Sequence, residues 1–198
     1  MSNIDQSSYF KEDLLLENKL YLLDYESLRD SPSFTILKFS DAHYLGEMKD
    51  GLRHGKGLMK YKSGRLFEGH WRNDIREGKG YERYANGHTY EGYYHKGKPH
   101  GYGVYSWGNN REQYEGEWYM GAKEGKGKWK NAQGDCYIGE WRRSKIEGQG
   151  VYMHNNGDKY EGKWLDNKKH GYGTIKYSNG NTYIGEFYEG QYHGKGFF

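Results

Sequence analysis

The sequence predicts an all-β fold: an elongated single-sheet solenoid of about seven antiparallel β-hairpins with an N-terminal capping segment. Two observations predict it. A Gly-x-Gly pair recurs at a constant distance after an aromatic-x-Gly-x phrase, and a repeat of this period indicates stacked units that share one core. The phrase recurs at intervals of 23, 23, 24, 23, 23 and 23 residues, beginning at Tyr44, Phe67, Tyr90, Tyr114, Tyr137, Tyr160 and Tyr183.

The composition indicates how such units would pack. The chain has 31 glycines and 22 tyrosines in 198 residues, and no glycine precedes Gly46. Domains of this length normally use a branched aliphatic core, so this chain is expected to bury aromatic rings against glycine backbone. The single cysteine, Cys136, excludes an internal disulfide framework and suits a reducing compartment. No apolar run approaches the ~18 residues of a membrane span, and no signal peptide is evident.

Residues 1–43 differ in kind from the rest of the chain. They carry eight acidic and four basic side chains, a net charge of −4, whereas the whole chain carries +3, so the repeats carry +7. The leucine-rich stretch from Glu12 to Leu23 predicts a short helix, and the alternation from Phe34 to Phe39 predicts a strand. Because the end of a solenoid exposes an apolar edge, this acidic segment is expected to cap the first hairpin. A docking peptide for a partner is a compatible alternative.

Residues 44–198 hold seven units, and each predicts two antiparallel strands. The boundaries are 44–66, 67–89, 90–113, 114–136, 137–159, 160–182 and 183–198, the last incomplete. Within a unit a polar connection joins the two runs, and Asn179-Gly180 predicts a tight turn because both residues tolerate positive φ. The third unit has one extra residue near Gly108-Asn109-Asn110, which predicts a local bulge.

Glycine inside a strand implies close approach by another group. We expect the aromatic ring of one unit to cover the glycine of the next, forming a stack that also offers a possible groove. Its members are Tyr44, Phe67, Trp71, Tyr90, Tyr94, Tyr114, Trp118, Tyr137, Trp141, Tyr160, Trp164, Tyr183 and Phe187.

The phrases YEGYYHKGKPHGYG from Tyr90 and YEGKWLDNKKHGYG from Tyr160 resemble the MORN repeat (membrane occupation and recognition nexus). The resemblance covers residues 44–198 and implies successive hairpins in a long, twisted, grooved sheet. It also implies a family of scaffolds, radial-spoke-head components, cytoskeletal adaptors and modules attached to enzymes. Some positions depart from its pattern: Asp74 and Ser144 replace a loop glycine, and Glu77, Glu124 and Glu147 replace a histidine.

No catalytic, cofactor or metal site is predicted, and an enzyme is not expected. The Gly-x-Gly pairs lack the spacing and the strand-to-helix context of phosphate or dinucleotide loops. Neighbouring hairpins stand ~10 Å apart, too far for one metal ion to use the histidines of adjacent units. Turn-stabilising hydrogen bonds are therefore expected of the recurring histidines, which are His54, His100, His170 and His193.

The net charge of the repeats indicates which classes of partner (protein, anionic phospholipid or nucleic acid) are more expected. Basic side chains crowd the hairpin loops, but acidic ones are interspersed and +7 is a modest excess, so a solvated rim is expected. Anionic phospholipid is therefore a weaker candidate partner than protein, and nucleic acid is weaker still. The lysines of this rim are Lys56, Lys79, Lys96, Lys98, Lys126, Lys168, Lys169 and Lys195.

The expected function is a non-catalytic scaffold or adaptor for protein–protein interactions, because periodic Tyr and Trp are favoured interface anchors. The resemblance implies a cytoplasmic assembly of a cilium, an axoneme or the cytoskeleton. The C-terminal edge, with exposed Phe197 and Phe198, predicts contact with a further chain and a homo- or hetero-oligomer. Two alternatives stay open: a peripheral membrane adaptor that binds anionic phospholipids, and the regulatory repeat fragment of a larger enzyme.

Overall fold

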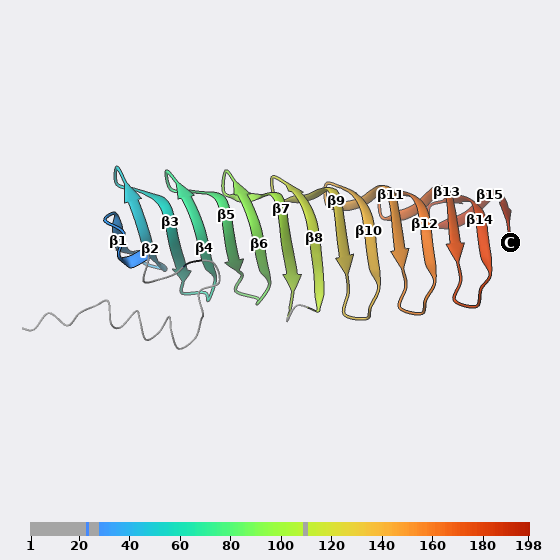
Figure 1. Ribbon diagram of the computed structural model, residues 1–198, viewed down its shortest axis with the longest axis horizontal. Coiled ribbons are helices and arrows are strands. Elements are labelled where there is room, and N and C mark those ends of the chain that lie inside the picture. Colours follow the sequence, from blue (N-terminus) through green and yellow to red (C-terminus); the bar gives the residue numbers. More distant parts are fainter. Residues whose placement is uncertain (1–22, 24–27, 109–110) are drawn as a thin grey trace, which may run out of the picture.

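The computed structural model describes residue 23, residues 28–108 and residues 111–198. It holds one 15-stranded antiparallel sheet in which every strand pairs with its neighbour in sequence (Figure 1). The strands are β1 (Phe34–Lys38), β2 (Ala42–Lys49), β3 (Leu52–Tyr61), β4 (Leu66–Arg72), β5 (Ile75–Arg83), β6 (Thr89–His95), β7 (Lys98–Trp107), β8 (Glu112–Tyr119), β9 (Ala122–Lys130), β10 (Cys136–Arg142), β11 (Lys145–Met153), β12 (Lys159–Leu165), β13 (Lys168–Lys176), β14 (Thr182–Tyr188) and β15 (Gln191–Phe197).

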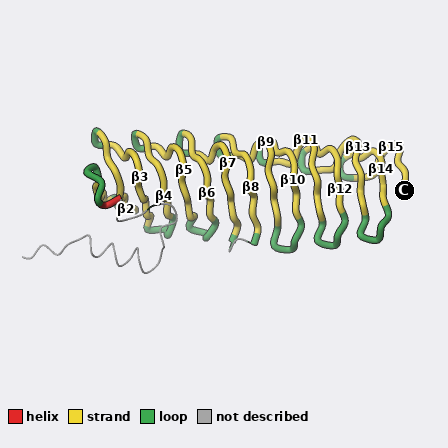
Figure 2. Tube along the Cα trace, viewed as in Figure 1, coloured by secondary structure: helices red, strands yellow, loops and turns green. Residues whose placement is uncertain are grey.

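The predicted single-sheet solenoid is confirmed. Seven hairpins follow one another from β2–β3 to β14–β15 along one long axis (Figure 2). The strand predicted from Phe34 to Phe39 is present as β1, which pairs with β2 ahead of the first hairpin. The helix predicted from Glu12 to Leu23 lies outside the described residues, apart from Leu23. In the described part of the chain, no helix is long and apolar enough to cross a membrane.

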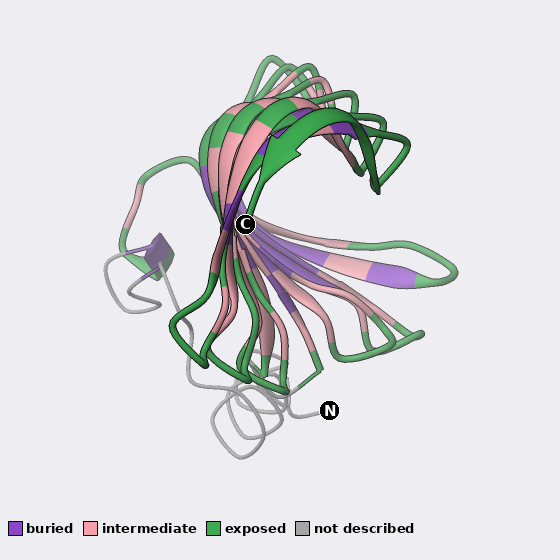
Figure 3. Cartoon of the chain, turned by 90° about the vertical axis from the view of Figure 1, so that its right-hand side faces the viewer, coloured by how far each residue is buried: buried purple, intermediate pink, exposed green. Residues whose placement is uncertain are grey.

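Each hairpin bends at a pair of facing glycines, which gives the sheet an inner and an outer face (Figure 3). In β10–β11, Gly139 faces Gly150, and the register shifts between Gly139 and Trp141. A methyl group on Gly139 would lie 2.6 Å from the Cα of Gly150, so glycine is required there. An irregularity in the ladder lets a strand bend, and the same shift recurs in the other hairpins.

The two-residue turns with positive φ lie within the units, at the polar connections. Asp166 and Asn167 have φ of 51° and 64°, the signs of a type I′ turn. At Asn179-Gly180 only the glycine has positive φ, at 92°, and the Tyr177 N–H donates to the Asn181 carbonyl across a longer loop. The turn predicted at Asn179-Gly180 is present, because the Gly180 N–H donates to the Tyr177 carbonyl at 3.0 Å.

Consecutive tight turns are hydrogen-bonded to one another. The Asn167 N–H donates to the Ile146 carbonyl at 3.0 Å, and the Asn167 Oδ1 accepts the Ile146 N–H at 2.8 Å. Asp74 and Ser144 make the same pair of bonds to the preceding unit. Where glycine takes this place, as at Gly190, only the bond to the carbonyl, here that of Lys169, forms among the described residues. The departures from glycine thus add a hydrogen bond between units.

The bulge predicted near Gly108 would interrupt the ladder between β7 and β8; Asn109 and Asn110 themselves lie outside the described residues. Strands β7 and β8 pair from Gly101 opposite Trp118 to Trp107 opposite Glu112 without a register shift. The predicted bulge at this point of the sheet is therefore wrong: adding a residue to a loop leaves the ladder hydrogen bonds intact, whereas a bulge interrupts them.

A small second core lies on the outer face at the N-terminal end. Leu45, Leu58 and Leu66 are buried there, with Phe34 and Ile36 of β1 and the ring of Tyr81 against them. The segment before β1 adds two buried leucines, Leu23 and Leu28, and the Leu23 N–H lies 3.4 Å from the Glu68 Oε2 that accepts it. Strand β1 and the two leucines before it therefore cover the apolar outer-face side chains of the first units.

Candidate functional site

A continuous layer of aromatic rings lines the inner face. Phe67 and Trp71 lie four residues apart on β4, a span of roughly 13 Å on a straight strand, yet their ring centroids are 5.2 Å apart. The bend brings them together, and the edge-to-face contact continues from unit to unit. Centroid distances are 5.1–5.6 Å and interplanar angles are 81–89° from Tyr44 to Phe187.

All thirteen residues of the sequence-derived set lie in this one buried cluster. The rings do not cover the glycines that the sequence predicted, those of the next unit. The ring of Tyr160 lies over Gly162 and Gly173 of its own hairpin, and the Trp164 Nε1 donates to the carbonyl of Gly150 in the preceding unit at 3.3 Å. The prediction that a ring covers the glycine of the next unit is therefore wrong in direction.

The tyrosine hydroxyls explain why tyrosine is used so often in this layer. The Tyr160 hydroxyl donates to the Lys163 carbonyl at 2.9 Å, at the bend of β12, and five other tyrosines repeat the bond. A carbonyl freed by the irregular ladder thus gains a partner, as buried backbone requires. Burial raises the pKa of the Tyr160 hydroxyl to about 12, so it stays a donor at neutral pH.

A second layer of side chains lies over the rings, on the second strand of each hairpin. The Arg53 guanidinium lies 4.5 Å from the Trp71 ring centroid, and the Arg76 guanidinium lies 4.4 Å from that of Phe67. Lys123 lies 4.7 Å from both Trp107 and Trp141 and 4.9 Å from Tyr114. Lys169 lies 5.0 Å from Tyr160. Such contacts between cations and ring faces are attractive.

In the N-terminal half of the inner face the cations are ion-paired. Glu82, about 1% exposed, pairs with Arg76 at 2.9 Å and with Arg65, and accepts the Tyr94 hydroxyl at 2.9 Å. Arg53 pairs with Asp74 at 2.8 Å, and its hydrogen bonds hold the pKa of that carboxyl below its usual range. A buried carboxylate is stable only with such partners.

In the C-terminal half the inner-face cations have no ion pair among the described residues. Burial lowers the pKa of Lys123 to about 8, partly offset by Glu112, and burial lowers that of Lys169, partly offset by Asp158. Half-buried aromatic rings flank these lysines and pack on the buried layer; they are Tyr105, Trp107, Trp129, Tyr152 and Tyr177.

Sequence reasoning missed this second layer and expected Lys169 in a solvated rim. That expectation is wrong: Lys169 is half-buried over Tyr160. A signal was available, because one position per unit recurs with the same spacing as the aromatic phrase. Its occupants are Arg53, Arg76, Pro99, Lys123, Ile146, Lys169 and Tyr192, each directly opposite the second aromatic position of its hairpin.

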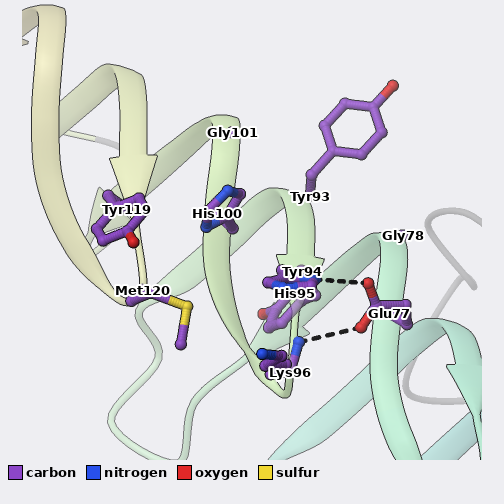
Figure 4. Close-up of a pocket in the computed structure, with 10 residues that line it drawn as sticks. All are labelled: Glu77, Gly78, Tyr93, Tyr94, His95, Lys96, His100, Gly101, Tyr119 and Met120. Carbon is purple, nitrogen blue, oxygen red and sulfur yellow. Dashed lines mark hydrogen bonds and ion pairs between the residues drawn. The ribbon is translucent and has the colours of Figure 1, made fainter.

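Shallow pockets also lie between neighbouring hairpins near their tight turns (Figure 4). In one of about 690 Å³, Glu77 accepts the Lys96 N–H at 3.0 Å and contacts the His95 Nδ1 at 2.8 Å. Turn-stabilising hydrogen bonds were expected of the recurring histidines, but the Nδ1 atoms of His54 and His100 are buried and have no hydrogen-bond partner among the described residues. Among the described residues, no group of three His, Cys, Asp or Glu side chains is placed to hold a metal ion.

Strand β15 forms the C-terminal edge of the described sheet and pairs only with β14. Phe197 and Phe198 are 78% and 83% exposed. The Phe198 ring lies 5.1 Å from that of Tyr183, at the end of the aromatic layer. Both phenylalanine rings are therefore exposed beside the last strand of the described sheet.

A family model described as MORN repeat matches residues 44–64, 67–89, 90–110, 114–136, 137–159, 160–182 and 183–198. No curated protein matches the chain. Among solved structures, the SAS-4 (dCPAP) TCP domain of Drosophila melanogaster, in complex with a proline-rich motif of Ana2 (dSTIL), is 15% identical, with 84% of this chain and 96% of that chain covered and a TM-score of 0.43. The TCP10 domain of Danio rerio CPAP with a STIL peptide is 13% identical, with 79% and 81% covered and a TM-score of 0.34. Scores this low support no transfer of function.

Proposed function

The chain belongs to the MORN-repeat family, and we propose that it is a non-catalytic scaffold that binds other proteins along the inner face of its sheet. MORN repeats generally mediate protein–protein or membrane interactions. The observation that favours protein is the second layer of the inner face, where a cationic side chain, Lys123, lies beside the half-buried ring of Trp107. Tyr, Trp and Arg are the residues that most often dominate binding energy at protein interfaces.

Rigidity supports the same function. The buried aromatic layer and the hydrogen bonds between turns hold the inner-face side chains in place before any partner arrives. Pre-ordered side chains lose less conformational entropy on binding, so more of the contact energy appears as affinity. A cytoplasmic assembly of a cilium, an axoneme or the cytoskeleton is the proposed setting. The β15 edge, with Phe197 and Phe198, is the proposed site for strand addition by another chain.

Residues 1–43 are proposed to cap the first hairpin and to offer a second contact of opposite charge to the repeats. Deletion of these residues is expected to weaken incorporation into the native assembly. Replacement of Phe197 and Phe198 by serine is expected to weaken the edge contact and to spare the inner face.

Site-specific photo-cross-linking in the native cell tests the proposal. A photo-reactive amino acid replaces Trp129 on the inner face in one variant and Tyr102 on the outer face in another, where the side chain is 53% exposed. Cross-linked protein is expected from the inner-face position and identified by mass spectrometry. If neither position captures protein, while the purified chain binds vesicles containing phosphoinositide at physiological salt, the scaffold proposal is wrong and a peripheral membrane adaptor replaces it.

A further inference from the structure

The two lysines of the second layer define a charged segment of the inner face. Lys123 and Lys169 occupy equivalent positions in the fourth and sixth units, opposite Trp118 and Trp164. The ammonium group of neither lysine has an ion pair or hydrogen bond among the described residues, whereas the guanidinium groups of Arg53 and Arg76 at the same position are ion-paired. The nearby carboxylate of Glu112 already accepts the Trp129 Nε1 at 2.9 Å.

An unpaired ammonium group in a half-buried place gains from an anionic partner. Folding already removes the ammonium group from part of its water, and that costs free energy. A carboxylate that binds at contact distance then gains a favourable Coulomb energy, because the surroundings have a low dielectric constant. Lys123 has ring faces of Trp107, Tyr114 and Trp141 around it. Those ring faces supply attraction, but no oxygen among the described residues accepts a hydrogen bond from the ammonium group, so its donors remain available.

The strand order sets the distance between the two charges. Lys123 lies on β9 and Lys169 on β13, four strand spacings away. At ~4.8 Å for each spacing, the two positions are about 19 Å apart along the axis. An extended chain that runs along this axis covers about 20 Å in six residues, and residues an even number apart project to the same side.

The surface between the lysines is apolar. Ile146 lies between them on the same row, and the rings of Trp129 and Tyr152 lie beside it, all partly buried against the aromatic layer. The N-terminal half differs, because the guanidinium groups of Arg53 and Arg76 there are already ion-paired with Asp74 and Glu82. The inner-face cations that have no ion pair among the described residues therefore lie in the C-terminal half.

We infer that the C-terminal half of the inner face binds an extended protein segment that carries two acidic side chains about six residues apart with apolar residues between them. This inference rests on the proposed scaffold function and names the class of its partner. A lipid bilayer fits the site poorly, because its surface is flat on this scale whereas the sheet is bent (Figure 3). Both lysines lie over rings of the buried layer that lines the inner face. An extended segment is narrow enough to enter.

Fluorescence anisotropy with synthetic peptides tests the inference. The probe is a labelled Thr/Val peptide with two Glu residues about six positions apart, and the spacing control has them about three positions apart. The full chain is compared with the variants Lys123→Met and Lys169→Met. The matched controls are Lys128→Met and Lys176→Met, which change exposed lysines on the same two strands. Far-UV circular dichroism establishes that each variant is folded.

Each inner-face substitution is expected to weaken the first peptide on the order of 10-fold or more, the usual effect of losing a charge-assisted hydrogen bond. The control variants Lys128→Met and Lys176→Met are expected to bind the first peptide with the affinity of the parent chain. The control peptide with closely spaced Glu residues is expected to bind the parent chain weakly. Equal binding of both peptides, or full affinity of the Lys123→Met and Lys169→Met variants, overturns the inference. The inference is also overturned, in favour of a lipid headgroup, by a second result: the parent chain binds phosphoinositide vesicles but no peptide, and the Lys123→Met and Lys169→Met variants lose the vesicle binding. If native partners still cross-link to Trp129-substituted chains that carry both Met substitutions, the scaffold function stands and only the acidic segment is wrong.

Discussion

Replacement of Trp141 tests the aromatic layer at its centre. The side chain is 7% exposed and contacts the rings of Tyr114 and Tyr137 at 5.1 and 5.4 Å. Truncation of a buried aromatic side chain to alanine costs about 3–5 kcal/mol. The Trp141 Nε1 also donates to the Gly127 carbonyl at 3.3 Å, and loss of that donor contributes about 1 kcal/mol. Trp141→Ala is therefore expected to lower the free energy of unfolding by about 4–6 kcal/mol.

Trp141→Phe separates packing from hydrogen bonding. Phe187 occupies the same position in the last unit and is buried, so a phenyl ring fits there. The variant loses the hydrogen bond and part of the ring volume, for an expected cost of about 1–2 kcal/mol. Urea denaturation followed by circular dichroism measures both variants, with the slope of the transition checked for loss of cooperativity. The reasoning is refuted if Trp141→Ala unfolds at the same urea concentration as the parent chain. It is also refuted if Trp141→Ala and Trp141→Phe lower the free energy of unfolding by the same amount.

Three further predictions concern the backbone and the buried charge. Gly162→Ala is expected to be severely destabilising in thermal melts, because the new methyl group would lie 2.6 Å from both the Gly173 Cα and the Tyr160 hydroxyl oxygen; a parent-like melting temperature would contradict this. Asn167→Gly keeps the turn but removes the bond from the Ile146 N–H, so a loss of about 0.5–1.5 kcal/mol is expected in urea denaturation, and an unchanged midpoint would count against the bond. Lys123 has a pKa near 8 in the folded chain against 10.5 ordinarily, so the unfolded state binds more protons between these values and stability should rise with pH there, relative to Lys123→Met. A pH-independent difference between the two chains would refute the buried charge.

The aromatic members of the candidate site were predictable from spacing alone. Tyr137 and Trp141 recur with the period of the unit, and alternation on a strand assigns residues to faces. Spacing also marks the recurring position of the second layer, but it does not show which groups that position contacts. Lys123 and Lys126 lie three residues apart on β9, one half-buried over rings and the other exposed, and the register shift at the hairpin bend decides which face each takes. A shift of one residue exchanges the faces of every later side chain.

By itself, the sequence determined the length of the unit, the number of hairpins and the single-sheet order. These follow because each short unit can bury its aromatic stripe only against an identical neighbour. Only the tertiary structure decided the bend at the facing glycines, the direction in which rings cover them, and the pairing of the inner-face charges. Arg76 meets Glu82 while Lys123 meets only rings, although both residues hold the same position in their units. The ion-pair partner of a charged side chain depends on which side chain the bent neighbouring strand places within a few ångströms of it. The spacing of residues within one repeat does not give this distance.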